Sequence, residues 1–383
     1  MKCRLGDLAR VSSSKRIYAK EYTTSGIPFY RGKEIIELGS GHLVSNKLFI
    51  SKDRFNQIRS KYDDVPEKDD VLITAVGTIG ETYLVKSRDL PFYFKDGNLI
   101  KLSKWNRQIV LPEYMYYWLN SYTGKMAIKK ITIGSTQQAI TIRELSDIEL
   151  DLPPIREQGK IAQRLTTLDF SIYNNKHINA NLLELISLIQ NEYSRTISNK
   201  VSLKSLAQKI ITGKTPSTKI QENYGYDIPF VKIPDMHDKV FIDKTGQSLS
   251  LQGANSQKNK YLPANAIMVS CIGTPGLVSL TGSVSQTNQQ INSLILEDKF
   301  IYWSFLELRS LRSQIGNLGS GGTTINNLNK SDFSKLEIII PDNDEVLDNF
   351  NHIAQPIFER IHTNNIEIRK LTQLKEALLN KLF

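Results

Sequence analysis

The sequence runs Asp70-Val71-Leu72-Ile73-Thr74-Ala75-Val76-Gly77-Thr78-Ile79-Gly80. A run of the same character returns as Asn265-Ala266-Ile267-Met268-Val269-Ser270-Cys271-Ile272-Gly273-Thr274-Pro275-Gly276, with one extra residue. Both stretches are almost continuously apolar and end between two glycines. A short apolar run bounded by turn residues is typical of a buried strand, and glycine permits the positive φ of a tight turn. Each stretch therefore predicts a buried strand followed by a tight turn.

These strands belong to a long internal repeat, because four further landmarks recur in the same order at offsets of about 185 to 201 residues. They are Leu5–Ala9 and Leu203–Ala207; Gly26–Arg31 and Asp227–Lys232; Gly134-Ser135 and Gly319-Ser320; and Ser146-Asp147 with Leu152-Pro153 against Ser331-Asp332 with Ile340-Pro341. A unit of about 190 residues is too long for a solenoid repeat. The chain is therefore two versions of one domain. Residues 33–65 and 233–262 have almost nothing in common, as two readers of different ligands would require.

Each domain is predicted to be α+β. The short strands are followed by a helical pattern, over Leu111–Lys129 in the first half and Ile301–Ile315 in the second. The strands and helices do not alternate as the βαβ units of a doubly wound sheet do. The expected architecture is two similar α/β domains separated by a pair of long antiparallel coiled-coil helices.

A heptad pattern closes each half and predicts these two long helices. Apolar residues spaced alternately by four and three form a seam that asparagines interrupt. The seam positions are Ile161, Leu165, Leu168, Ile172, Leu182, Ile186 and Ile189 in the first helix, and Ile357, Ile361, Ile368, Leu371 and Leu378 in the second. The simplest partner for each seam is the other helix, and the asparagines would fix the register. Ordinary core or oligomerisation helices are the alternative.

The expected boundaries follow from these patterns. Residues 1–152 form the first domain, 153–199 a central spacer helix, 200–341 the second domain and 342–383 a C-terminal spacer helix. A helix of about 40 residues would be about 60 Å long. An antiparallel pair would therefore act as a rigid spacer between the two domains.

Composition narrows the class of protein. The 383 residues carry a formal charge of +10, and the excess lies in residues 1–150, with 24 basic and 17 acidic side chains, and in 201–341, with 14 and 10. Two such basic blocks suit a polyanion, although a generic basic surface for solubility is the alternative. No membrane-spanning run or signal-peptide core is seen, and two cysteines and five histidines show no metal-ligand spacing. We expect a cytoplasmic protein without a metal or cofactor.

The sequence shows no complete catalytic motif of the kinds expected for a methyltransferase, a nucleotide-binding enzyme or a hydrolase. The Pro153-Pro154 pair lacks the polar residue before it and the aromatic residue after it that an adenine methyltransferase needs to grip a flipped base. Gly213-Lys214-Thr215 resembles the end of a P-loop, but Gln208 stands where the first glycine of that loop would be. No Gly-x-Ser-x-Gly elbow occurs. The sequence thus favours a binding protein over its two rivals, an enzyme that acts as a single chain and a coiled-coil adaptor that binds only proteins.

One segment resembles a known family. Leu152-Pro153-Pro154-Ile155-Arg156-Glu157-Gln158, followed by Ile161-Ala162, Leu165 and Leu168-Asp169, is similar to the signature of the specificity (S) subunits of type I restriction–modification enzymes, as is Gly134–Ile140 upstream. The resemblance covers essentially the whole chain, but Pro341-Asp342-Asn343-Asp344-Glu345 departs from the signature in the second half.

This resemblance implies a non-catalytic subunit that recognises double-stranded DNA. Each target-recognition domain would read one half of an interrupted, asymmetric site, and the helices would fix the spacing between the halves. Two adenine methyltransferase (M) subunits would dock on the helices and domains to form the DNA methylation complex. Two restriction/translocase (R) subunits would join for cleavage.

Candidate DNA-binding residues are those whose side chains suit base edges or phosphates. They follow the Pro-Phe landmarks, occupy the glycine turns, form a basic cluster, or lie in the segments Lys95–Asn98 and Thr287–Gln290, which fall at matching places in the two halves. Plain surface charge, hairpin turns, and polar loops or strand edges are the alternatives. The candidates are Arg31, Lys33, Lys52, Arg54, Arg59, Lys61, Thr78, Lys95, Asn98, Lys232, His237, Thr274, Gln289 and Gln290. For Ser135, Thr136, Gln137 and Gln138 we expect helix capping or packing instead of DNA contact.

Overall fold

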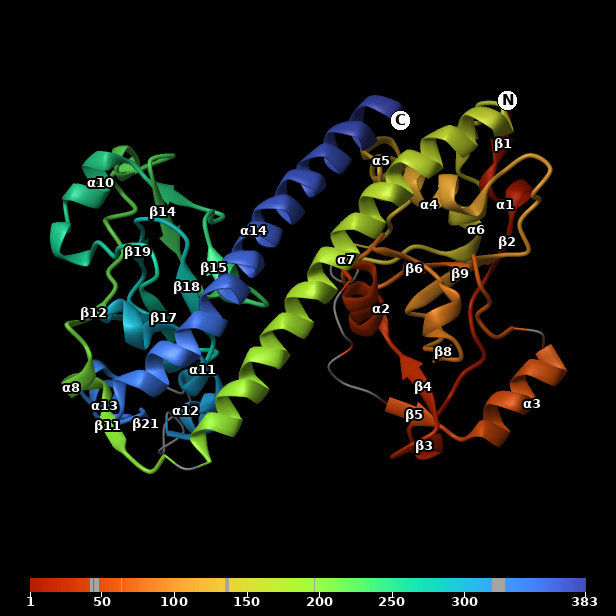
Figure 1. Cartoon of the computed structure of the whole chain (residues 1–383). Coiled ribbons are helices and arrows are strands. Elements are labelled where there is room, and N and C mark those ends of the chain that lie inside the picture. Colours follow the sequence, from red (N-terminus) through yellow and green to blue (C-terminus); the bar gives the residue numbers. More distant parts are fainter. Residues whose placement is uncertain (42–43, 45–47, 63, 135–137, 196, 319–327) are drawn as a thin grey trace. The chain divides into compact units, whose positions relative to one another are not determined.

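The computed structural model describes residues 1–383 except 42–43, 45–47, 63, 135–137, 196 and 319–327 (Figure 1). The chain divides into two units: unit 1 comprises Met1–Tyr173 and Arg369–Phe383, and unit 2 comprises Asn174–Ile368. Helix α7 (Ile155–Ser194) and helix α14 (Asp344–Leu382) each contribute residues to both units. The Gly319-Ser320 landmark of the repeat lies outside the described residues.

The described part of unit 1 contains two four-stranded sheets and a separate strand pair. Its strands are β1 (Lys2–Arg4), β2 (Arg10–Ser12), β3 (Tyr22–Thr23), β4 (Ile27–Tyr30), β5 (Leu48–Ile50), β6 (Val71–Thr74), β7 (Thr82–Leu84), β8 (Tyr93–Phe94), β9 (Leu99–Ser103) and β10 (Glu149–Asp151). The order β2-β9-β6-β7 forms an antiparallel sheet, and the order β3-β5-β4-β8 includes a parallel β4–β8 pair. The predicted strand at Val71 is thus β6, inside the first sheet.

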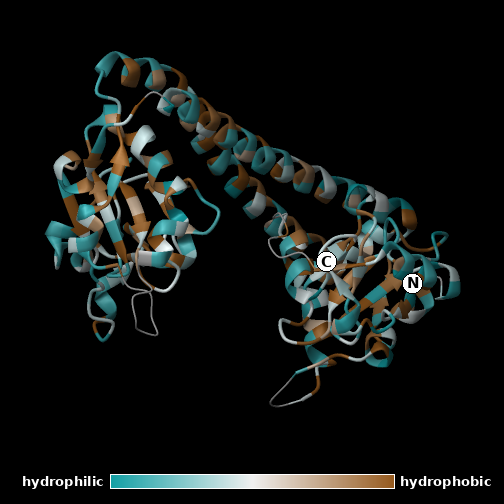
Figure 2. Ribbon diagram, turned by 90° about the horizontal axis from the view of Figure 1, so that it is seen from below, coloured by the Kyte–Doolittle hydropathy of each residue, from teal (hydrophilic) through white to brown (hydrophobic). Residues whose placement is uncertain are grey.

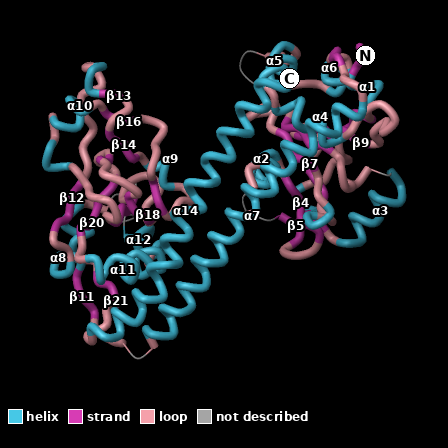
Figure 3. The backbone as a smooth tube through the Cα atoms, turned by 45° about the horizontal axis from the view of Figure 1, so that its top comes forward, coloured by secondary structure: helices cyan, strands magenta, loops and turns pink. Residues whose placement is uncertain are grey.

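Unit 2 repeats this plan in its described residues. Its strands are β11 (Lys200–Ser202), β12 (Lys209–Thr212), β13 (Tyr224–Gly225), β14 (Ile228–Val231), β15 (Phe241–Ile242), β16 (Ser248–Leu249), β17 (Ile267–Ser270), β18 (Val278–Thr281), β19 (Gln286–Thr287), β20 (Ile291–Ile295) and β21 (Glu337–Ile339). The sheets have the orders β12-β20-β17-β18-β15 and β13-β16-β14-β19, and the β14–β19 pair is parallel. Figure 3 shows β12 beside β20, with β18 in the same unit. Sheet order and pairing confirm both the duplication and the α+β class. The landmark that matched Ser146-Asp147 with Ser331-Asp332 was wrong, because the corresponding strands β10 and β21 begin at Glu149 and Glu337, 188 residues apart, which makes Ser146 equivalent to Ser334.

Helices surround the sheets in both units. Unit 1 has α1 (Leu5–Leu8), α2 (Gly32–Gly39), α3 (Lys52–Tyr62), α4 (Pro112–Asn120), α5 (Tyr122–Lys130) and α6 (Ile142–Ser146). Unit 2 has α8 (Leu203–Leu206), α9 (Ile233–Met236), α10 (Leu251–Asn255), α11 (Asp298–Ser310), α12 (Arg312–Leu318) and α13 (Lys330–Lys335).

The prediction of one helix over Leu111–Lys129 was wrong, because the chain breaks it at Ser121. Ser121 is extended, with φ −72° and ψ 165°, and its hydroxyl accepts a hydrogen bond from the Gly124 main-chain nitrogen at 3.2 Å. A serine in this position caps a new helix instead of continuing the old one. The second predicted helix is divided as well, at Leu311 between α11 and α12.

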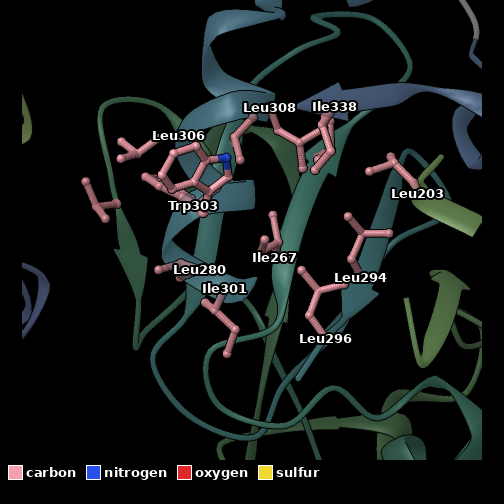
Figure 4. Packing of buried hydrophobic residues seen from close by; sticks show 14 of the residues in the cluster. Leu203, Ile267, Leu280, Leu294, Leu296, Ile301, Trp303, Leu306, Leu308 and Ile338 are labelled. Atoms are coloured by element: carbon pink, nitrogen blue, oxygen red, sulfur yellow. The ribbon is translucent and has the colours of Figure 1, made fainter. Parts of the chain in front are cut away.

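Apolar packing holds each unit together. In unit 2 the side chain of Trp303 on α11 is fully buried in an apolar cluster that includes Ile267 and Leu294 of the central sheet, and Figure 4 shows this cluster at close range. Figure 2 shows hydrophobic residues concentrated on the strands of each unit and mixed with hydrophilic ones along the two long helices. Phe350 and Phe358 of α14 are buried in the same apolar cluster as Trp303. This part of α14 therefore belongs to the core of unit 2.

In unit 2, α7 and α14 pack against each other in antiparallel orientation. Ile186 and Ile361 are both fully buried in one apolar cluster, and the rings of Tyr193 and Phe350 lie 6.3 Å apart. Asn364 Nδ2 donates a hydrogen bond to Asn179 Oδ1 at 2.8 Å. Residue numbers that increase along α7 are thus paired with residue numbers that decrease along α14, as expected for antiparallel helices.

In unit 1 the other ends of the same helices meet in the same orientation. Leu165 of α7 and Leu379 of α14 are buried together with Tyr117 of α4. Lys375 Nζ donates to Asp169 Oδ1 at 2.6 Å, and the Tyr117 hydroxyl donates to Asp169 Oδ2 at 2.8 Å. The start of α14 and the end of α7 therefore belong to unit 2, and their opposite ends belong to unit 1.

The Pro-Pro segment is the entry to α7. The carbonyl of Pro154 accepts hydrogen bonds from the main-chain nitrogens of Glu157 and Gln158. Gln158 is fully buried: its Nε2 donates to the carbonyl of Ile109 at 2.8 Å, and its Oε1 accepts from the nitrogen of Leu111 at 3.0 Å. The glutamine of the signature thus fixes the start of the helix to the loop before α4.

Candidate nucleic-acid interface

The two glycine turns have the same hydrogen-bond frame. After β6, the Thr74 hydroxyl donates to the carbonyl of Thr78 at 2.5 Å, and Gly80 N donates to the Thr74 carbonyl at 2.9 Å. After β17, the Ser270 hydroxyl donates to the carbonyl of Thr274 at 2.6 Å, and Gly276 N donates to the Ser270 carbonyl at 2.9 Å. Gly77 and Gly273 have φ of 81° and 79°. Thr78 and Thr274 are therefore equivalent, exposed residues at the tips of these turns.

In unit 1, four of the predicted residues lie at one edge of the sheets, which we call edge 1: Arg31, Thr78, Lys95 and Asn98. Lys95 N donates to the carbonyl of Tyr30 at 2.9 Å, so Lys95 stands beside Arg31 where the parallel strands β8 and β4 end. Ala75 N donates to the carbonyl of Asn98 at 2.8 Å, which brings Asn98 to the turn that carries Thr78. Strand pairing therefore gathers residues from three separate segments.

Unit 2 has a corresponding edge 2, made of Lys232, Thr274, Gln289 and Gln290. Asn288 N donates to the carbonyl of Val231 at 3.1 Å, and Cys271 N donates to the carbonyl of Gln290 at 2.8 Å. A Cβ on Gly273 would lie 3.9 Å from Gln290 Nε2, so this side chain borders the turn. Both glutamines use the side-chain oxygen locally: Gln289 accepts from the Thr215 hydroxyl at 2.6 Å, and Gln290 from Asn288 Nδ2 at 2.9 Å. An amide oxygen has a second lone pair, so each can still serve in a two-point contact with adenine.

Arg31 and Lys232 also have structural partners that the sequence interpretation did not consider. Arg31 donates from Nη2 to Glu34 Oε1 at 2.7 Å and from Nε to Oε2 at 3.2 Å, while Glu34 is fully buried. Burial alone would raise the pKa of Glu34, but the hydrogen bonds from Arg31 outweigh it and hold that pKa below its usual value. Lys232 N donates to Asp235 Oδ2 at 2.9 Å in the corresponding position, and Lys232 Nζ donates to Gln247 Oε1. Arg31 is thus committed in part to capping α2.

The predicted basic cluster Lys52, Arg54, Arg59 and Lys61 lies on α3, whose Phe55 and Ile58 pack into a separate apolar cluster. Arg54 is paired with Glu21 at 2.8 Å. At the other end of α3, the ammonium groups of Lys61 and Lys15 lie 5.4 Å and 5.0 Å from the centre of the Tyr62 ring. Lys61 and Lys15 thus both form cation–π contacts with the Tyr62 ring. Lys15 belongs to a segment that lies next to edge 1, as described below.

Lys33 and His237 are exposed and lie outside the two edges as we define them. Lys33 Nζ is 3.7 Å from Glu37 Oε1 on the next turn of α2, and His237 follows the end of α9. Of the residues expected to cap or pack, Ser135, Thr136 and Gln137 are outside the described residues.

Sequence reasoning missed one segment in each unit. Ser13-Ser14-Lys15-Arg16 lies along the loop that carries Lys95 and Asn98: the Ser14 hydroxyl donates to the carbonyl of Phe94, and Arg16 Nε lies 3.1 Å from Asp96 Oδ2. In unit 2, Lys214 N donates to the carbonyl of Thr287 at 3.0 Å. The missed signal is a basic residue, Lys15 or Lys214, four positions after an apolar strand residue in each unit. These strand residues, Val11 and Ile210, are equivalent because they pair with the corresponding residues Leu102 and Leu294.

The predicted seam residues differ in burial. Leu165, Ile186 and Ile361 are fully buried. The others are half-buried: Ile161, Leu168, Ile172, Leu182, Ile189, Ile357, Ile368, Leu371 and Leu378. Leu185 and Leu374, which correspond in the two halves, are 48% and 49% exposed and so belong to the outer faces of the helices.

Within the described residues, no cluster of three or more His, Cys, Asp or Glu side chains suits a metal ion. Among the same residues, no helix has the length and apolar character needed to cross a membrane.

Comparison with known proteins identifies the class to which this duplicated fold belongs. The family model described as "Type I restriction modification DNA specificity domain" matches residues 1–184 and again 198–379. The chain therefore belongs to the family of type I restriction–modification DNA specificity proteins. Within that family it is a specificity subunit with two recognition domains.

Individual relatives agree over the full length. The chain is 31% identical to the type I restriction enzyme HindI specificity subunit of Haemophilus influenzae, over 99% of this chain and 97% of that protein. It is 25% identical to the MjaIX specificity subunit of Methanocaldococcus jannaschii, over 95% of this chain and 87% of that one. The crystal structure of an S subunit from M. genitalium matches with a TM-score of 0.61 at 16% identity, over 100% of this chain and 96% of that one. At this identity the last match supports the fold alone.

Proposed function

We propose that this subunit binds a bipartite, asymmetric site on double-stranded DNA, with unit 1 and unit 2 each reading one half, and that it catalyses no reaction itself. The observation that carries the proposal is the pair of edges. The turn frames at Thr78 and Thr274 are the same, but the side chains beside them differ: Lys95 and Asn98 in unit 1, Gln289 and Gln290 in unit 2. A shared frame with different polar groups suits two domains that read different bases.

Within each edge we assign base contacts to the amide side chains and phosphate contacts to the cations. Asn98, Gln289 and Gln290 can each form the two-point contact with adenine that Asn and Gln prefer. Lys95 is the proposed phosphate contact of edge 1. Outside the two edges, the proposed contacts to phosphate or base edges are Lys33, Lys52, Arg59, Lys61 and His237. Arg31, Arg54 and Lys232 have side-chain partners in the structure, so for these we propose a positioning role with a secondary contact to DNA.

The proposed partners are adenine methyltransferase subunits, in two copies, and restriction/translocase subunits. Two similar units, each with its own ends of α7 and α14, offer two similar docking surfaces, which supports two copies of the methyltransferase subunit. We also propose the division of the chain into two domains and two spacer helices with boundaries after residues 152, 199 and 341. It is supported by β11, which begins at Lys200, and by β21, which ends at Ile339. DNA as ligand also supports the cytoplasmic location expected from the sequence.

The test is co-purification with a methyltransferase subunit, followed by sequencing of the modified adenines. The proposal expects methylation at an interrupted motif that depends on this chain. A continuous motif, or methylation that does not need the chain, would contradict it. The rival of a single-chain enzyme predicts that the chain alone methylates or cleaves DNA when S-adenosylmethionine is supplied. The rival of a protein-only adaptor predicts no salt-dependent DNA binding.

A further inference from the structure

Four lysines of unit 2 come together beside edge strand β12. Lys209 begins β12, and Lys214 follows it by two residues. Lys260 reaches across from the short 3-10 helix η4 (Lys258–Lys260), where its Nζ donates to the carbonyl of Thr212 at 2.9 Å. Lys330 begins α13, which packs against β12. We call this set the lysine cluster.

The cluster carries positive charge that the protein does not neutralise. Lys209, Lys214 and Lys330 are exposed and Lys260 is half-buried, and none of the four forms an ion pair within the residues that the structure describes. Burial and the nearby charges of Lys330, Lys214 and Lys209 lower the pKa of Lys260, so the other three ammonium groups lie close enough to act on it. Like charges held together cost stability. A bound anion would remove that cost.

The cluster is continuous with edge 2. Lys214 N donates to the carbonyl of Thr287, two residues before Gln289, and the neighbouring Thr215 hydroxyl donates to Gln289 Oε1. Gln257, which is buried, donates from Nε2 to the carbonyl of Lys214 at 2.8 Å and to Gln286 Oε1 at 2.7 Å. These contacts fix the main chain at Lys214 to the loop that presents the glutamines. A ligand at edge 2 would therefore extend to the lysines.

We infer that the lysine cluster binds the sugar–phosphate backbone of DNA next to the half-site that unit 2 reads. This inference rests on the proposed function and adds to it the group that holds the strand. Phosphates are the anions that a DNA strand presents at regular spacing, and Lys binds them as a point charge. Protection of an exposed edge strand by lysine is the competing explanation. It accounts for Lys209, but not for Lys260 and Lys330, which lie on other segments.

Among the described residues of unit 1, two of the four basic positions have a basic counterpart and a third does not. Strand register places Arg10 at the position of Lys209 and Lys15 at that of Lys214. Ile142, which follows the cap Thr141, stands where Lys330 follows the cap Asn329. Backbone contact at this position should therefore be weaker in unit 1.

The experiment measures the salt dependence of binding of the full-length chain to a random-sequence DNA duplex, so that base recognition does not contribute. The test variant is Lys214→Gln with Lys330→Gln. The control is Lys239→Gln with Lys244→Gln, two exposed lysines that flank β15 at the opposite edge of the same sheet. Each lost phosphate contact lowers the slope of log Kobs against log salt by about 0.9. The inference predicts a fall of about 1.8 in the test variant, no fall in the control, and retention of the slope in Lys214→Arg with Lys330→Arg.

An unchanged slope in the test variant, or an equal fall in the control, would overturn the inference while leaving the proposed function intact. Absence of salt-dependent binding by the wild-type chain would overturn both. Circular dichroism spectra that match the wild type would show that the exposed substitutions leave the fold unaltered.

Discussion

Asn98 and Gln290 occupy the same position in the two units. The main-chain carbonyl of each accepts a hydrogen bond at 2.8 Å from the residue that follows the central strand, Ala75 in unit 1 and Cys271 in unit 2. The main chain is thus held in the same way, while the side chains differ by one methylene and by their neighbours. Under the proposed function, this pair would supply two related but distinct groups for contact with bases.

Arg31 is expected to be needed for the stability of unit 1 more than for base recognition. Arg31→Ala would leave the buried Glu34 carboxylate with main-chain donors alone, at a cost of about 2 kcal/mol. The pKa of Glu34 would rise in the variant, so the loss should be larger at pH 7 than at pH 4. Urea unfolding measures the effect.

Lys232→Ala is the matched control, because Asp235 keeps its bond to the main chain of residue 232 and is only half-buried. Equal stability of Arg31→Ala and wild type, together with a loss of DNA binding, would instead make Arg31 a direct DNA contact.

The spacing between half-sites is expected to follow the length of the long helices. Insertion of one heptad into α7 and one into α14 preserves the apolar seam, since a heptad repeat keeps the same helix face in contact. The methylated motif should then keep both half-site sequences and change only the number of bases between them. A changed half-site sequence, or an unchanged gap, would refute the role of the helices as a spacer.

Asp70 should make the stability of unit 1 depend on pH. Burial raises its pKa to about 6, although Lys101 Nζ lies 3.5 Å away and opposes the shift. The folded state therefore binds this proton more tightly than the unfolded state. The resulting stabilisation is present below about pH 4 and is lost as the pH rises to about 6, with an upper limit of about 3 kcal/mol.

Asp70→Asn should abolish this dependence. The fluorescence of Trp105, whose indole donates to the carbonyl of Asp69 at 2.9 Å, reports local unfolding close to the site. A wild-type and variant pair with parallel stability curves between pH 4 and 7 would contradict the assignment.

The asparagines between the helices are expected to be coupled. Asn364 is fully buried and donates to Asn179, which donates from Nδ2 to Asn365 Oδ1 at 2.9 Å. Asn364→Leu would deprive the side-chain oxygen of the half-buried Asn179 of its donor and cost about 1 kcal/mol. Leucine at both 179 and 364 should recover most of that loss by apolar contact, at the expense of register. A double-mutant cycle in denaturant gives the coupling energy, and additive effects would argue against the pair.

Local patterns were enough to predict the parts of the fold that repeat. The strand and glycine turn around Thr78 and Thr274 follow from apolar runs and glycines alone, and the correspondence of the segments that hold Asn98 and Gln290 follows from their order in the chain. The break at Ser121 was not predicted, because a heptad or helical pattern does not reveal which serine will cap a new helix.

Long-range pairing was the part that sequence reasoning could not supply. Lys214 was interpreted as the end of an incomplete P-loop, and its place beside Gln289 depends on the register of β12 with β20. Lys101 was not singled out from the sequence, yet its ammonium group is buried between Asp64 and Asp70, 3.8 Å and 3.5 Å from their carboxylates. The residues that sequence assigned to DNA by charge, such as Arg31 and Arg54, carry partners that only the folded chain reveals.

The most direct test of the account is to sequence methylated adenines in cells that express the methyltransferase subunit with wild-type chain, Asn98→Ala or Gln290→Ala. Loss of a two-point base contact should relax recognition by about 1–3 kcal/mol at the base concerned. The account predicts an interrupted motif for the wild type, with one half relaxed by Asn98→Ala and only the other half relaxed by Gln290→Ala. If both substitutions relaxed the same half, or if the wild-type motif were continuous, the assignment of one half-site to each unit would be wrong.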